Sequence, residues 1–256
     1  MRNPIAALGA FFLSRAAALL DDTFFIGEIF SRSFKALFNV PRESRRRFVH
    51  LVVIHVYYTG VRSLPLAGLL AVMAGLGLGK FVEVQGAFSL VGPLLIVLSH
   101  YLAPLLAMIV IAVRTALQVT LELSEMRGSD ELRDLQALGA DAPGIIALPR
   151  LLGIGVGTVG CCYVVTAVAI LSMHSVVANH PTIGGQEYLM NLAPDAALRA
   201  TLLGLFYGLV ISLVSLRHGL LLLDRGGEVA VAASQAIVKS IVLCVLLTGL
   251  LSVGVG

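Results

Sequence analysis

Long apolar stretches separated by short polar segments dominate the chain from residue 48 onward. Five of these stretches approach or exceed the length of about 20 residues that an α-helix needs to cross a bilayer. Inside hydrocarbon, a helix satisfies its own backbone hydrogen bonds, whereas an open sheet does not. The pattern therefore predicts an all-α membrane protein. The predicted spans are residues 63–81, 90–121, 145–176, 198–216 and 229–255.

The N-terminal part has a different pattern. Its first apolar stretch contains Arg15 and is not followed by a clear small-residue cleavage site, so it does not resemble a signal peptide. We expect residues 4–38 to form interfacial or elbow helices that lie along the membrane surface, and residues 48–61 to form an amphipathic lead-in. The chain then divides into N-terminal interfacial helices, residues 1–61, and a five-helix transmembrane domain, residues 62–256.

Glycine and proline modify two of the predicted spans. Three glycines alternate with leucine in residues 75–79, which would let a neighbouring helix approach closely. Pro104 lies inside the second span and should bend it, whereas Pro93 can sit in the first turn at little cost. The stretches 177–197 and 217–228 are polar, and we expect a loop and a joint there.

Positive charge gives the spans a direction. Nine Lys and Arg residues lie in residues 1–62, three in 122–150 and two in 217–228. The opposite side carries only Lys80 and Arg199. Because loops rich in Lys and Arg stay in the cytoplasm, we expect a cytoplasmic N-terminus and, after five spans, a periplasmic C-terminus.

Composition supports the membrane assignment: 58% of the residues are hydrophobic and 13% are charged, and the mean hydropathy is +0.94. The net charge of +3 does not indicate nucleic-acid binding, because the basic residues cluster beside apolar spans. Three cysteines and six histidines are dispersed without metal-ligand spacing. No ATP-binding loop, metalloprotease motif or nucleophile elbow occurs. We therefore expect no catalytic residues, no metal and no cofactor.

A few polar residues interrupt the spans. His100 and Tyr101 lie in the middle of span two, Arg114 lies further along it, and Lys239 lies inside span five. Ionisable groups at such depth usually face a protein interior, a cavity or a partner. For Lys239, snorkelling toward the headgroups and a functional role are both open. Arg114 could likewise snorkel, or pair with a carboxylate of a neighbouring element.

The polar segment after span two contains the signals of a short amphipathic helix at residues 129–139. Ser129 can cap it, Asp130 and Glu131 suit its first turn, and Gly139 can end it. Leu132, Leu135 and Leu138 recur at threefold spacing and form one apolar face. Such a helix could insert into a groove on a partner, or it could lie on the membrane.

Residues 100–153 resemble the core of the MlaE permease family, which includes YrbE and chloroplast TGD-type proteins. The family pattern reads roughly RELGP, GR, AELGTM and VTEQIDAL, with a later PR-x-LA. Departures from it are His100-Tyr101 for Arg-Glu, Val113 for Gly, and Ala142 for Pro. These departures indicate a divergent branch. The positions that match are Pro104, Arg114, Glu122, Met126, Gly139, Asp141, Pro149 and Arg150.

The resemblance implies a permease subunit of an ABC-type lipid transport system in the inner membrane. Two copies would pair, a separate ATPase would bind from the cytoplasm, and an MCE-domain protein would cap the periplasmic side. A phospholipid would occupy a cavity between the copies, near spans one and two. A membrane scaffold that passes no lipid is the alternative. The implied ATPase-coupling residues are Glu122, Ser129, Asp130, Glu131, Leu132, Leu135, Leu138 and Gly139, and the lipid-pocket candidates are Leu66, Leu70, Met73, Gly77, Val97, His100, Tyr101 and Pro104.

Overall fold

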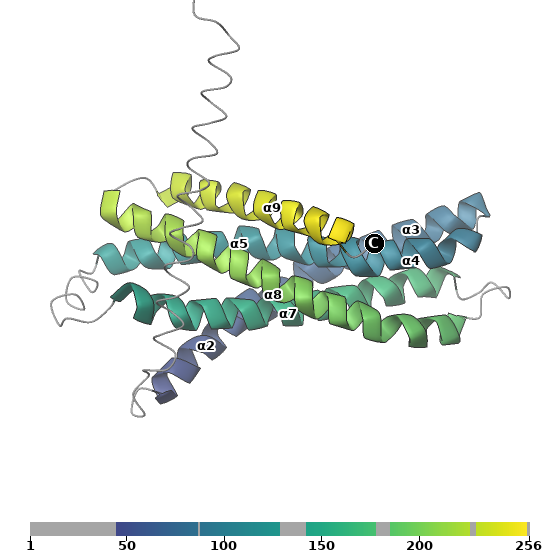
Figure 1. Cartoon of the computed structure of the whole chain (residues 1–256), viewed down its shortest axis with the longest axis horizontal. Helices are drawn as coiled ribbons and strands as arrows, with labels where there is room; N and C mark the ends of the chain where they lie inside the picture. The colour runs from purple at the N-terminus through teal and green to yellow at the C-terminus, as the bar shows by residue number, and fades with distance from the viewer. Residues whose placement is uncertain (1–44, 87, 129–141, 178–184, 226–228, 255–256) are drawn as a thin grey trace, which may run out of the picture.

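The computed structural model describes residues 45–86, 88–128, 142–177, 185–225 and 229–254 (Figure 1). Within these residues, all regular structure is helical. The first half contains α2 (Arg45–Thr59), η2 (Val61–Ser63), α3 (Leu64–Gln85), η3 (Phe88–Leu90), α4 (Val91–Val97), the π-helical turn η4 (Leu98–Leu102) and α5 (Ala103–Gly128). The second half contains α7 (Ala142–Val177), α8 (Gly185–Arg225) and α9 (Val229–Gly254).

Five helical segments are long and apolar enough to cross a membrane, which confirms the predicted number of spans. The segments run from Phe48 to Gln85, Val91 to Met126, Ile146 to Val177, Pro194 to Leu220 and Val229 to Leu250. The first segment includes α2, so the predicted lead-in is continuous with span one. The predicted N-terminal helices at 4–38 and the helix at 129–139 lie outside the described residues.

Span four is longer than the sequence suggested. The predicted loop at 177–197 is wrong from Gly185 onward, because α8 begins there and continues through Pro194. The predicted joint at 217–228 is likewise helical as far as Arg225. Polar residues such as Gln, Glu and Arg are good helix formers in water, so a helix can continue past the membrane surface without an apolar pattern to reveal it.

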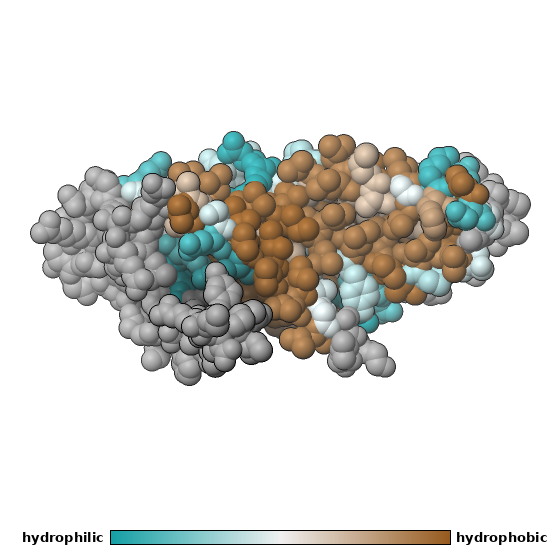
Figure 2. Space-filling model, turned by 90° about the horizontal axis from the view of Figure 1, so that it is seen from above, coloured by the Kyte–Doolittle hydropathy of each residue, from teal (hydrophilic) through white to brown (hydrophobic). Residues whose placement is uncertain are grey.

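Most of the helices run along the long axis of the molecule, whereas α2 lies obliquely to it (Figure 1). Helix α7 has the most extensive contacts with the others. This helix packs against α2, α3, α5 and α8. By contrast, α9 packs against α5 and α8, on the opposite side of the bundle from α2 (Figure 1). The apolar belt of a membrane protein is visible along most of the surface, with hydrophilic residues gathered toward the two ends (Figure 2).

Glycines set the close approach of helices to α7. A Cβ at Gly75 would lie 2.5 Å from the carbonyl oxygen of Ala169, and one at Gly79 would lie 2.9 Å from the side chain of Val176. The prediction of a close neighbour for residues 75–79 is thus confirmed. Gly153 on α7 likewise allows close contact with α2, since a Cβ there would lie 2.5 Å from the Cβ of His55. Small residues let apolar helices gain packing contacts that lipid does not supply.

The π-helical turn η4 ends two residues before Pro104. A proline ring has no N–H and collides with the carbonyl four residues earlier, here that of His100. A widened turn of the π type relieves this collision, and such turns are known sources of helix kinks. The irregularity predicted at Pro104 therefore begins one turn ahead of the proline.

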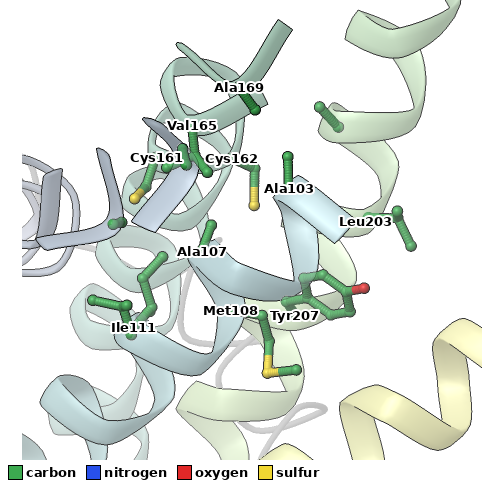
Figure 3. Close-up of a cluster of buried hydrophobic side chains, with 14 of the residues drawn as sticks. Ala103, Ala107, Met108, Ile111, Cys161, Cys162, Val165, Ala169, Leu203 and Tyr207 are labelled. Atoms are coloured by element: carbon green, nitrogen blue, oxygen red, sulfur yellow. The ribbon is translucent and has the colours of Figure 1, made fainter. Parts of the chain in front are cut away.

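The core lies where α5, α7 and α8 meet (Figure 3). Tyr207 is fully buried there beside Met108, and its hydroxyl lies 2.6 Å from Oγ1 of Thr248 on α9. Alanine and cysteine fill the closest contacts, because their small side chains allow the helix axes to approach. Cys161, Cys162 and Cys244 are free and buried.

Candidate functional site

The two faces of α3 have opposite characters. Ala67, Ala71, Gly75 and Gly79 are buried on the side that contacts α7. The four lipid-pocket candidates of this helix lie on the other side, where Leu66, Leu70 and Met73 expose 51%, 36% and 66% of their surface. Gly77 is exposed as well, with nothing within 4 Å of a Cβ built on it. The candidates therefore share one outward apolar face.

The four candidates on span two are not gathered in the same way. Val97 is half exposed, whereas His100 and Pro104 are buried. The π-helical turn η4, which carries His100 and Tyr101, packs against α7 and α8 as well as its flanking helices. The candidates of α3 are thus exposed on the surface of the chain, whereas His100 and Pro104 are buried within it.

Tyr101 contacts an arginine from a distant part of the sequence. Nη1 of Arg199 on α8 lies 3.3 Å from the Tyr101 hydroxyl, and the guanidinium lies 6.0 Å from the ring centroid. His100 beside it is only 8% exposed, and in the described structure its Nε2 is buried without a hydrogen-bond partner. Where the family pattern has an Arg-Glu pair, this chain thus has a tyrosine that is paired with an arginine from another helix.

Glu122, predicted to couple to an ATPase, forms an ion pair at the opposite end of the bundle. Its Oε2 lies 3.0 Å from Nη2 and 3.1 Å from Nε of Arg150, which is only 4% exposed. Gln118 donates a hydrogen bond of 2.8 Å to the other carboxylate oxygen. The cluster joins the end of α5 to the start of α7. The ion pair therefore holds α5 against α7 close to the points where the two helices leave the described residues.

Arg114 bonds to a carbonyl rather than to a carboxylate. Its Nη1 donates a hydrogen bond to the backbone oxygen of Arg62. The Arg62 guanidinium in turn lies 5.6 Å from the ring centroid of Tyr58. A groove of about 500 Å³ lies beside these residues and is lined by Tyr58, Arg62, Arg114, Leu117, Gln118, Leu121, Glu122 and Glu125.

The remaining predicted residues are placed as follows. Lys239 is half-buried on α9, one residue before the buried Ser240. Residues 129–139, which contain the other seven predicted coupling positions, lie outside the described residues. Among the residues that the structure describes, no group of three or more His, Cys, Asp or Glu side chains could hold a metal ion.

Sequence reasoning missed Arg150 and Arg199 as partners. The first lies 28 positions from Glu122 and the second lies 98 positions from Tyr101. Local spacing cannot reveal pairs that form only when separate helices pack together. The signal that was present is chemical: a charged residue at the end of an apolar helix needs either water or a partner.

The sequence profile described as "Permease MlaE" matches residues 52–253. The chain belongs to the MlaE permease family. The match begins inside α2, covers most of the chain and includes nearly all of the five spans. MlaE permeases are membrane subunits of ABC-type transporters, and the helical architecture with five spans suits that role. A comparison with curated proteins gave no match.

Proposed function

We propose that this chain is the permease subunit of a system that moves phospholipid between the inner and outer membranes, together with an MCE-domain protein on the periplasmic side. ATP would be hydrolysed by a separate cytoplasmic subunit. The observation that carries the proposal is the family match across the spans. The excess of Lys and Arg in residues 1–62 supports a cytoplasmic N-terminus and a periplasmic C-terminus.

The lipid would lie against the exposed face of α3. That face is apolar, and the described part of the chain leaves Leu66, Leu70 and Met73 exposed. A second copy of the permease would enclose it, so the cavity would form between two copies rather than within one. Tyr101 and Arg199 would then offer a polar group and a positive charge to a lipid headgroup toward the periplasmic end of the cavity, where the charge pattern places Arg199.

The ATPase would act through the segment that joins α5 to α7. Because Glu122 and Arg150 tie these helices together, a displacement of the segment would move both helices as a unit. The buried core between α5, α7 and α8 would carry the motion toward α3, which packs on α7. Close-packed interiors transmit such displacements because they deform little.

The test uses the purified complex of permease, ATPase and MCE protein in vesicles. Met73→Trp adds bulk to the exposed α3 face, and Leu171→Trp adds the same bulk to an exposed position of α7, where Leu171 is 63% exposed. We expect ATP-dependent lipid transfer to fall at least tenfold in the first variant and to stay within twofold of the parent in the second.

Two results would argue against the proposal. Equal rates of lipid transfer by the Met73→Trp and Leu171→Trp variants would show that the lipid does not pass along the exposed face of α3. Transfer that does not respond to ATP in the parent complex, with the ATPase bound at full occupancy, would instead favour the scaffold role. Binding of the ATPase is measured in the same preparations, so that failed assembly is not mistaken for failed transport.

A further inference from the structure

The groove between η2 and α5 has no part in the proposed transport path. Its volume of about 500 Å³ falls in the range of small-molecule sites. One wall carries Tyr58 and Arg62, and the other is the outer side of α5 from Arg114 to Glu125. The groove is therefore bounded by two arginines at one end and by two glutamates at the other.

The spacing of charged residues places the two arginines at a membrane boundary. No charged residue occurs between Arg62 and Lys80, which are about 27 Å apart along a helix. That distance is close to the hydrocarbon thickness of about 30 Å. Arg114 is the first charged residue after Glu83 along the next span, and it touches the backbone of Arg62. Tyr58 is exposed beside them, as expected for an interfacial tyrosine.

The charges at this end of the groove are positive. Of the two glutamates, Glu122 is bound by Arg150. Glu125 lies about 16 Å from Arg114 along α5, near the aqueous end of the groove. Neither glutamate that lines the groove therefore lies within one helical turn of Arg114 along α5. A guanidinium offers several N–H groups in a planar fork, which suits a phosphate, and Arg114 uses Nη1 for the Arg62 carbonyl.

Apolar residues continue from the arginines in both directions along α5. Ile109, Val113, Leu117 and Leu121 recur every four residues and expose 40%, 41%, 47% and 45% of their surface. Residues at this spacing lie on one side of a helix. Ile109 and Val113 lie on the hydrocarbon side of Arg114, where an acyl chain would run. The groove thus has two arginines that suit a phosphate at one end, and exposed apolar residues that lead from them into the hydrocarbon region.

We propose that this groove binds an anionic glycerophospholipid of the leaflet at the Arg62 end. The phosphate lies between the Arg62 and Arg114 guanidinium groups, and an acyl chain follows Val113 and Ile109. A zwitterionic headgroup brings its own cation and gains less from two arginines. A basic residue near an anionic membrane surface contributes an affinity factor of about fivefold. The proposal concerns a binding site and does not require that the protein transports lipid.

The chain contains no tryptophan, which permits a specific reporter. Tyr58→Trp places a single fluorophore on the wall of the groove and keeps an aromatic ring under Arg62. The full chain is reconstituted in nanodiscs that contain phosphatidylglycerol or phosphatidylcholine brominated close to the ester group. Leu205→Trp, at an exposed position on α8, is the matched control on the lipid-facing surface. Bromine quenches tryptophan only at close range, so quenching reports which lipid occupies each site.

The relative affinity of the groove, measured by quenching of the Tyr58→Trp fluorophore, should be at least fivefold higher for brominated phosphatidylglycerol than for brominated phosphatidylcholine. This preference should weaken at high salt. Arg62→Gln in the reporter background should reduce the preference severalfold, and Arg62→Lys should retain most of it. Arg62 is exposed, so neither change should disturb folding. The Leu205→Trp control should show little preference. Equal quenching by the two lipids at the groove, or a preference unchanged by Arg62→Gln, would overturn the proposal.

Discussion

The two ends of the helix bundle use polar residues in different ways. At one end, Arg150 is buried but paired with Glu122, and Gln118 satisfies the remaining carboxylate oxygen. Toward the other end, His100 is buried and its Nε2 has no hydrogen-bond partner among the described residues, and Tyr101 contacts Arg199 at the long distance of 3.3 Å. Buried polar groups are nearly always satisfied when their role is structural. The Glu122–Arg150 pair therefore suits a structural role, whereas under the proposed function His100 and Tyr101 would serve the ligand.

The largest expected effect is that of Glu122→Ala, which would leave the buried Arg150 without its counter-ion. Removing one partner of a buried ion pair costs about 3–5 kcal/mol, and the partial exposure of Glu122 places this variant at about 3 kcal/mol. Unfolding in mixed detergent micelles measures the loss. A cost below about 1 kcal/mol would contradict a structural role for the pair.

A second variant, Arg150→Met, tests the other partner of the ion pair. It removes the buried cation and leaves Glu122, whose side chain is 29% exposed and can bind water. We expect a smaller loss of about 1–2 kcal/mol, since a hydrated carboxylate is cheaper than a buried guanidinium. The double variant Glu122→Gln with Arg150→Met should be more stable than Glu122→Ala alone. Equal losses of stability in the two single variants would contradict the difference in burial between Arg150 and Glu122.

His100→Leu tests the opposite end. An apolar side chain of similar size removes a buried polar atom that has no partner, so the protein should become more stable by about 1 kcal/mol. Transfer of lipid in the reconstituted complex should nevertheless fall, because the site loses a polar group. Lower stability with unchanged transfer would show that His100 serves the fold and not a ligand.

Tyr101→Phe should have the smallest effect. It removes the hydroxyl contacted by Arg199 and keeps the ring beside the guanidinium. We expect a change in stability of about 0.5 kcal/mol, the low end of the range for one hydrogen bond. Thermal unfolding followed by circular dichroism provides the measurement, with Tyr163→Phe, which removes an exposed hydroxyl contact to Thr201, as the control. A loss of more than about 2 kcal/mol would mean that Tyr101 belongs to a structural network.

The sequence predicted the spans well because the free energy of placing apolar side chains in lipid depends mainly on composition. The close packing of α3 at Gly75 and Gly79 was also predictable, since small residues in a membrane helix often mark the contact with a neighbouring helix. The polar start of α8 was not, because a solvated helix and a polar loop have similar compositions. Leu189, Leu192 and Ala196 do recur at helical spacing within residues 185–197, but Gly185 and Pro194 are typical of loops and obscure that signal.

The site was predictable only in part. The outward face of Leu66, Leu70 and Met73 follows from helical spacing, since a helix that packs on one side exposes the other. The pairing of Glu122 with Arg150, and of Tyr101 with Arg199, depends on how α5 meets α7 and α8. Sequence distance gives no information on such contacts.

Control of the lipid site by the ATPase is tested most directly by photocrosslinking of lipid at Met73 in the full complex, with and without a non-hydrolysable ATP analogue. A photoreactive residue at this position reports whether lipid occupies the exposed face of α3. We predict that the analogue changes the yield of lipid crosslinks at least threefold at Met73, and that it leaves the yield at Leu171 unchanged. Equal yields at Met73 in both states would contradict control of the lipid site by the ATPase.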